Sequence, residues 1–166
     1  MKSDYKNKYG KFNGNEAEYA LRVLDSESTQ NRGFPWVTEF EDSFCELSGA
    51  KYSIAVNSAT SGLHAALVAA DVGPGDEVIQ PALTVIMNSL VTIACGATPV
   101  FVDINPDTWN IDTDSISKNI TSKTKAIMAV SLFGLPLDIE PIMDLAKKHN
   151  LIVIDDSAET ITGNHT

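Results

Sequence analysis

The sequence contains few cysteines, and their spacing suggests no shared function. Cys45 and Cys95 are the only two among 166 residues. They are too far apart to match the paired spacing of zinc ligands, and disulfide frameworks are typical of small, cysteine-rich secreted domains. We therefore expect two buried free thiols and no metal site built from them.

Long apolar runs and positive charges are also scarce. No run approaches the roughly 20 apolar residues needed to span a bilayer, and no basic start with an apolar core and a cleavage site is visible. Lys and Arg number 12 against 22 Asp and Glu, which gives a net charge of −10. This balance disfavours binding to nucleic-acid backbones or anionic membranes. We expect a cytoplasmic protein that uses neither as a partner and holds any phosphate through local donors.

Residues 1–30 are predicted to form a polar amino-terminal tail followed by a helix, and a second amphipathic helix follows them. Both predictions rest on apolar residues at helical spacing. These are Ala17, Ala20, Leu21 and Leu24 in the first helix, and Trp36, Phe40, Phe44 and Leu47 in the second. We expect Phe40, Phe44 and Leu47 to lie in a core, together with a similar stripe further along the chain, Ile139, Ile142, Met143 and Ala146.

From residue 52 onward, short apolar runs alternate with longer helical segments. The predicted strands are 52–56, 77–80, 98–104, 125–130 and 151–155, and the predicted helices are 61–70, 85–96 and 139–150. Residues 103–112 look like turn formers after a strand. The alternation predicts an α/β fold, with a mostly parallel sheet and helices on both faces, in one domain over residues 31–166.

Two segments carry candidate ligand-binding groups at strand ends, where open parallel sheets bind their ligands. The first, residues 57–61, leads from a predicted strand into a helix. Its backbone amides and hydroxyls could hold a phosphate, although such residues also serve as ordinary helix caps. The segment lacks the glycine-lysine phosphate loop and the dinucleotide fingerprint, so a nicotinamide dehydrogenase is disfavoured.

The second segment is the aspartate pair that ends the last predicted strand. Successive strand residues alternate faces, so only one of Asp155 and Asp156 is expected to face a given ligand. That carboxylate could meet a cationic ligand atom, or the pair could cap a turn and face solvent. Magnesium is a further alternative, but no lysine-bearing phosphate loop accompanies the pair.

Three blocks of the sequence, 34–67, 73–112 and 124–160, resemble successive blocks of the DegT/StrS sugar aminotransferases. The resemblance implies the amino-terminal part of an aspartate-aminotransferase-like large domain that binds pyridoxal 5′-phosphate (PLP). It also implies a nucleotide-linked keto sugar as substrate, an amino donor such as glutamate, a homodimer, and a role in amino-sugar or surface polysaccharide synthesis.

The resemblance also implies roles for individual residues. Ala59, Thr60 and Ser61 match the turn that receives the cofactor phosphate. Asp156 matches the carboxylate that meets the pyridine nitrogen, and Glu159 matches a position near the ring hydroxyl. An ionised carboxylate beside the ring nitrogen favours the pyridinium form, which makes the ring a better electron acceptor.

Two departures from the family pattern matter most. Val85 stands where the family commonly has an aromatic residue stacked on the cofactor ring. The Schiff-base lysine of the family lies beyond residue 166, so we expect a fragment truncated before it and name no catalytic residue.

Histidine in place of that lysine would indicate the sugar dehydratases of the same family, and neither residue would indicate a non-catalytic binding or assembly module. The position of the Schiff-base lysine is not matched by Lys123, Lys125, Lys147 or Lys148. His165 lies too close to Asp156 in sequence to match it and does not decide between these activities. His64 is expected to be a surface or packing residue.

Overall fold

A computed structural model of the protein describes residues 14–25 and 35–160. The chain divides into two compact units, Met1–Ala55 and Val56–Thr166. The sequence suggested a boundary near residue 30 instead, and that domain assignment stays a prediction. Most of the predicted polar tail and His165 lie outside the described residues.

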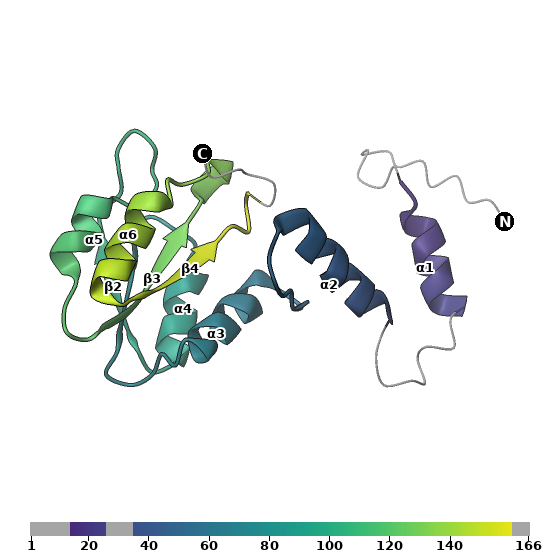
Figure 1. Cartoon of the computed structure of the whole chain (residues 1–166), viewed down its shortest axis with the longest axis horizontal. Coiled ribbons are helices and arrows are strands. Elements are labelled where there is room, and N and C mark those ends of the chain that lie inside the picture. The colour runs from purple at the N-terminus through teal and green to yellow at the C-terminus, as the bar shows by residue number, and fades with distance from the viewer. Residues whose placement is uncertain (1–13, 26–34, 161–166) are drawn as a thin grey trace. The chain divides into compact units, whose positions relative to one another are not determined.

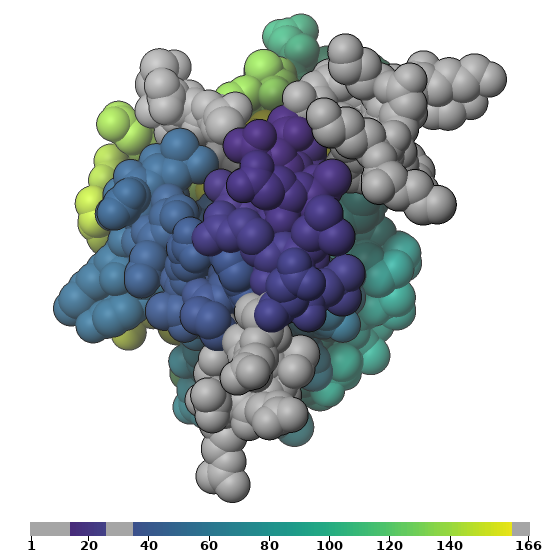
Figure 2. Space-filling model, turned by 90° about the vertical axis from the view of Figure 1, so that its right-hand side faces the viewer, coloured from purple at the N-terminus to yellow at the C-terminus, as the bar shows by residue number. Residues whose placement is uncertain are grey.

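The first unit contains helices α1 (Glu16–Asp25) and α2 (Pro35–Ser48), which confirms the two predicted helices. Within this unit the Arg22 guanidinium lies over the Trp36 ring, 4.9 Å from its centroid. Neither helix contains a buried residue, and the side chains of α1 lie at the surface in Figure 2. Phe40 and Leu47 are 58% and 69% exposed. Their predicted place in a core was wrong, because an apolar stripe becomes core only where another element covers it.

The second unit is a parallel sheet between two pairs of helices (Figure 1). Its four strands lie in the order β2-β1-β3-β4, and all neighbouring pairs are parallel. The strands are β1 (Glu77–Pro81), β2 (Thr98–Val102), β3 (Thr124–Val130) and β4 (Ile152–Asp156). The helices are α3 (Ala59–Ala69), α4 (Met87–Ala94), α5 (Thr113–Asn119) and α6 (Glu140–His149). The predicted α/β fold is confirmed.

Each face of the sheet has its own core. Successive residues of β3 alternate between them, so Met128 packs with α3 and α4 while Ile127 packs with α5 and α6. Both side chains are fully buried, because helices cover both faces. Ile142 and Ala146 of α6 are buried as predicted, whereas Met143 is 38% exposed.

Three local features differ from the sequence predictions. Residues 52–56 form no strand, because none of the described strands pairs with them. Helix α5 was not predicted, since its one buried residue is Ile116. Cys45 and Cys95 are free as expected, but both are only half-buried.

Candidate functional site

A cavity of about 240 Å³ lies between the start of α3 and the end of β4. Its lining from α3 is Ala59, Gly62, Leu63 and Ala66, and its lining from β4 and the following turn is Ile154, Asp155, Asp156, Ser157 and Ala158. The cavity therefore brings together the two segments that sequence reasoning singled out separately.

The start of α3 combines a helix cap with free backbone donors. Ser58 is the cap residue, and its Oγ accepts a hydrogen bond from the Ser61 amide at 3.2 Å. The amide of Gly62 makes the first helical bond, to the Ser58 carbonyl. Among the described residues, the amides of Ala59 and Thr60 have no acceptor. The capping alternative is therefore correct for Ser58, and two amides still remain for an anion.

Asp156 is a buried carboxylate at the carboxyl end of β4. Its side chain is 6% exposed and lies on the same face of the strand as Ile154, towards α3 and α4. Its Oδ1 accepts from the Ala158 amide at 3.4 Å, and its Oδ2 accepts from Asn88 Nδ2 at 3.0 Å. Asp155 is exposed, and Ser157 Oγ donates to its Oδ2 at 2.7 Å. The alternation of the pair is present as expected, and the ligand assigned to Asp156 stays a prediction.

Sequence reasoning missed Asn88, which lies on α4 and is fully buried. Besides Asp156, its Nδ2 lies 2.9 Å from Met128 Sδ. Its Oδ1 accepts a hydrogen bond from Thr84 Oγ1 at 3.1 Å. The one signal in the sequence was a polar amide inside an apolar helical segment. A buried amide without hydrogen-bond partners is unfavourable, so its presence there indicates a polar partner.

The remaining predicted site residues are not among those that line the cavity. Thr60 and Ser61 directly follow Ala59 in the first turn of α3. Val85 is 43% exposed and precedes α4. Glu159 is exposed, and its Oε2 accepts from the Phe133 amide at 2.5 Å. Their predicted contacts with a cofactor stay predictions.

The basic side chains of the second unit lie away from this cavity. Asp156 pairs with Val130 at the carboxyl end of β3, whereas Lys125 lies at the other end of that strand, roughly 16 Å away at about 3.3 Å per residue. Lys147 and Lys148 lie in the last turn of α6, which leads into the start of β4. An anion at α3 would therefore meet backbone donors rather than these lysines. His64 of α3 is exposed, as expected.

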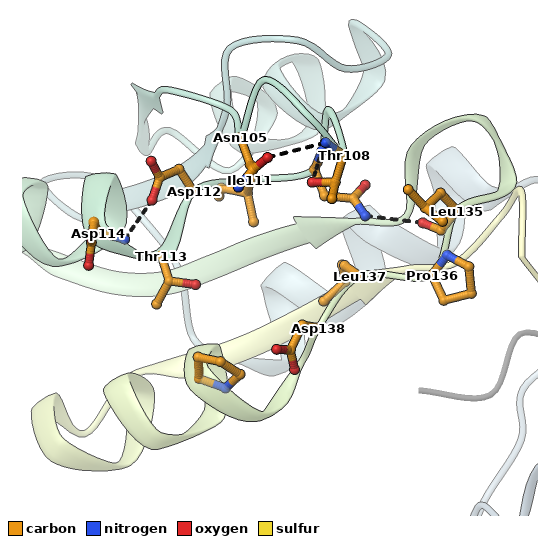
Figure 3. A pocket seen from close by; sticks show the side chains of 12 residues that line it. Asn105, Thr108, Ile111, Asp112, Thr113, Asp114, Leu135, Pro136, Leu137 and Asp138 are labelled. Atoms are coloured by element: carbon orange, nitrogen blue, oxygen red, sulfur yellow. Dashed lines mark hydrogen bonds between the residues drawn. The ribbon is translucent and has the colours of Figure 1, made fainter. Parts of the chain in front are cut away.

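A second cavity, of about 430 Å³, lies against α5 and α6 (Figure 3). Its carboxylates include Asp112, whose Oδ1 caps α5 by accepting from the Asp114 amide at 2.8 Å. Asn110 joins two loops beside it, because its Nδ2 donates to the Leu135 carbonyl and its Oδ1 accepts from the Leu132 amide. These polar groups thus have structural partners.

Neither a metal cluster nor a membrane span occurs in the described parts of the chain. Residues 14–25 and 35–160 contain no group of three or more His, Cys, Asp or Glu side chains that could hold a metal ion. Over the same ranges, no helix combines the length and apolar character required to cross a bilayer.

The fold is that of the PLP-dependent aminotransferases. An aminotransferase structure from Psychrobacter cryohalolentis superposes with a TM-score of 0.83 at 43% identity, covering 90% of this chain and 38% of that one. A structure of GDP-4-keto-6-deoxymannose-3-dehydratase with a trapped PLP-glutamate geminal diamine gives a TM-score of 0.83 at 27% identity, covering 93% of this chain and 41% of the other. These similarities confirm the predicted aspartate-aminotransferase-like architecture.

The chain belongs to the DegT/DnrJ/EryC1/StrS aminotransferase family, whose model matches residues 11–165. It is 45% identical over 151 residues to GDP-perosamine synthase from Caulobacter vibrioides, a match that covers 91% of this chain and 40% of the relative. The chain thus spans about 40% of the length of this curated relative. The predicted family resemblance is confirmed.

Proposed function

We propose that this chain forms the cofactor-binding part of a PLP-dependent aminotransferase that acts on a nucleotide-linked keto sugar. The observation that carries the proposal is the cavity shared by a helix start with two free amides and a buried carboxylate. PLP has an anionic phosphate at one corner and a basic ring nitrogen at another, so its two ends require these two kinds of group. The residues present fit the cofactor.

Three groups at the cavity have defined tasks in this proposal. The amides of Ala59 and Thr60 bind the phosphate and hold it without a cationic side chain. The carboxylate of Asp156 binds the protonated ring nitrogen and keeps the proton there. When bound, PLP accepts into its ring the electron pair released as a substrate carbon loses its proton. Thr60, Ser61, Val85 and Glu159 complete the surroundings of the cofactor.

The family and its members support a more detailed proposal. GDP-perosamine synthase and GDP-4-keto-6-deoxymannose-3-dehydratase are both named for GDP-linked sugars, so we assign a nucleotide-linked keto sugar as substrate. Glutamate is the proposed amino donor. The complete protein would work as a cytoplasmic homodimer in amino-sugar or surface polysaccharide synthesis.

The test uses the full-length protein with PLP, a GDP-linked 4-keto sugar and glutamate. Mass spectrometry should detect an amino sugar together with the 2-oxo acid derived from glutamate. Near-ultraviolet and visible absorbance should show bound PLP before substrate is added. Bound PLP without an amino sugar would support the cofactor site and reject this substrate. Absence of PLP binding would reject the proposed function.

A dehydratase of the same family is the second candidate, because one of the similar structures is a sugar 3-dehydratase. The same reaction mixture distinguishes the two. A dehydratase would remove a hydroxyl group from the sugar and add no nitrogen, so its product would be lighter than the substrate, whereas transamination would replace the keto oxygen by an amino group. A non-catalytic module would bind PLP weakly or not at all and would leave the sugar unchanged.

A further inference from the structure

We infer that Asn88 is a positioning residue for Asp156, and that Thr84 in turn fixes the orientation of the Asn88 amide. The inference rests on the proposed function, because the carboxylate being positioned is the one assigned to the cofactor nitrogen. The three residues form a hydrogen-bonded chain from Thr84 Oγ1 to Asn88 Oδ1, at 3.1 Å, and from Asn88 Nδ2 to Asp156 Oδ2, at 3.0 Å.

The direction of this chain follows from donor and acceptor chemistry. An ionised carboxylate can only accept hydrogen bonds, so the Asn88 atom that faces Asp156 must be the amide nitrogen. The amide oxygen then faces Thr84, whose hydroxyl donates to it. A flipped amide would bring two acceptor oxygens together in a fully buried position, which is unfavourable. Thr84 and Asp156 therefore select the same orientation of Asn88.

Burial makes this contact important for Asp156. The carboxylate is 6% exposed, and taking a charge out of water is costly unless donors replace the lost hydration. It accepts hydrogen bonds from two neutral groups, Asn88 Nδ2 at 3.0 Å and the Ala158 amide at 3.4 Å. Asn88 supplies the shorter of these bonds, and bonds to an ionised acceptor are stronger than neutral ones.

The contact also fixes where the carboxylate lies. Asn88 and Asp156 are 68 residues apart in sequence, and the bond joins helix α4 to the end of β4. Asn88 is fully buried, so its side chain has little freedom to follow a moving partner. A carboxylate held in one orientation before the cofactor binds avoids the entropic cost of ordering it during binding.

The first test replaces Asn88 in the full-length protein. Asn88→Leu keeps a side chain of similar size and removes the donor. We expect PLP affinity, measured by fluorescence titration, to fall roughly 10- to 100-fold, as when the partner that orients a ligating side chain is removed. The visible circular dichroism of bound PLP should change, and ¹⁵N NMR of labelled cofactor should show the ring nitrogen losing its proton at lower pH than in the wild type.

Two threonine variants separate positioning from simple structural support. Thr84 and Thr92 both donate a hydrogen bond to Asn88, but Thr84 bonds the side chain at 3.1 Å and Thr92 bonds the backbone carbonyl at 2.9 Å. Thr84→Val should reproduce part of the change in circular dichroism and ring-nitrogen protonation. Thr92→Val makes the same chemical change at the threonine that bonds the Asn88 backbone. It should leave the circular dichroism and the ring-nitrogen protonation as in the wild type.

The outcomes distinguish this inference from the proposed function. If the wild-type protein binds no PLP, the proposed function fails and the inference fails with it. If the wild type binds PLP and Asn88→Leu and Thr84→Val retain its affinity and spectra, the positioning role alone is rejected. Equal spectral changes in Thr84→Val and Thr92→Val would also reject it, because they would indicate a general loosening of α4. Should Asn88→Leu fail to fold, the comparison of the two threonine variants decides.

Discussion

The backbone amide of Phe133 donates a hydrogen bond to the side chain of Glu159, and this bond joins the turn after β3 to the segment after β4. Gly134 lies at the same junction with φ +82°, and a Cβ there would lie 3.5 Å from the Glu159 carbonyl oxygen. The segment that follows Asp156 is therefore held against a neighbouring strand end. Asp156 and Glu159, two of the predicted cofactor ligands, are fixed relative to each other through this contact.

The carboxylate charge of Asp156 is expected to be essential for transamination. Asp156→Asn keeps the shape of the side chain but removes the negative charge that holds a proton on the ring nitrogen. Turnover in the full-length protein should fall by roughly 100-fold or more, the range seen when one electrostatic partner of a reacting centre is removed. Steady-state kinetics measures the loss, and Asp144→Asn, at an exposed carboxylate of α6 on the other face of the sheet, is the control. Near-normal turnover of Asp156→Asn would contradict the assignment.

The phosphate site at α3 can be tested by removing a single backbone donor. Ala59 is the first residue of α3, and Ser58 before it is extended, with φ −163° and ψ 156°. Both features suit proline, which is tolerated at the first helical position and lacks an N–H. We expect Ala59→Pro to fold normally and to lower PLP affinity roughly 10-fold or more, since a hydrogen bond to a charged group is worth about 1.5–3 kcal/mol.

A matched control for this substitution exists on α5. Thr113 is the first residue of α5 and also follows an extended cap residue, Asp112, with φ −86° and ψ 118°. Thr113→Pro makes the same change at a helix start that does not line the α3 cavity, so PLP affinity should be unchanged. An equal loss of affinity in both variants, measured by fluorescence titration, would mean that the effect is not local to the phosphate.

The main strands could be predicted from the sequence because both faces of the sheet are buried. Runs such as 126–130 are apolar without interruption, and glycine or proline marks many of their boundaries. Residues 52–56 are also mostly apolar, but a strand also needs a hydrogen-bonded neighbour, which apolar side chains do not specify. Helix α5 was missed because its polar composition hides its one buried residue, although the Asp112 cap before Ile116 was a usable signal.

The candidate site could be predicted only in its locally encoded parts. The capping residues before α3 and the aspartates after β4 are visible in short stretches of sequence. The bond between Asn88 and Asp156 is not, because it depends on how α4 packs against a strand 68 residues later. The Glu159 contact with Phe133 likewise depends on two strand ends lying side by side.

The Cys95 thiol should react more slowly than an ordinary thiol at a given pH. Burial raises the pKa of Cys95 above its usual value, and the thiolate is the reactive form. Because of this raised pKa, the thiol stays neutral to higher pH in the folded state than in the unfolded state. The free energy of unfolding should therefore fall as the pH rises from the thiol pKa of the unfolded chain towards that of the folded chain. Thiol labelling over a pH series measures the rate. The Cys95→Ser variant shows how much of the labelling belongs to Cys95 and how much to Cys45. Labelling of Cys95 at the rate of a free thiol would contradict this prediction.

An aromatic residue at position 85 should strengthen cofactor binding. Val85 precedes α4 and is 43% exposed, so a larger side chain has room there. Val85→Tyr would restore the flat stacking surface that the family commonly has, and such contacts are worth about 0.5–1.5 kcal/mol beyond the buried area, or roughly 2- to 12-fold in affinity. Ile86→Tyr adds the same ring at a neighbouring position that is 62% exposed. This position is not the one at which the family has its stacking residue, so affinity should be unchanged. Fluorescence titration with PLP measures both variants, and weaker binding by Val85→Tyr would show that the ring of the cofactor does not lie against this position.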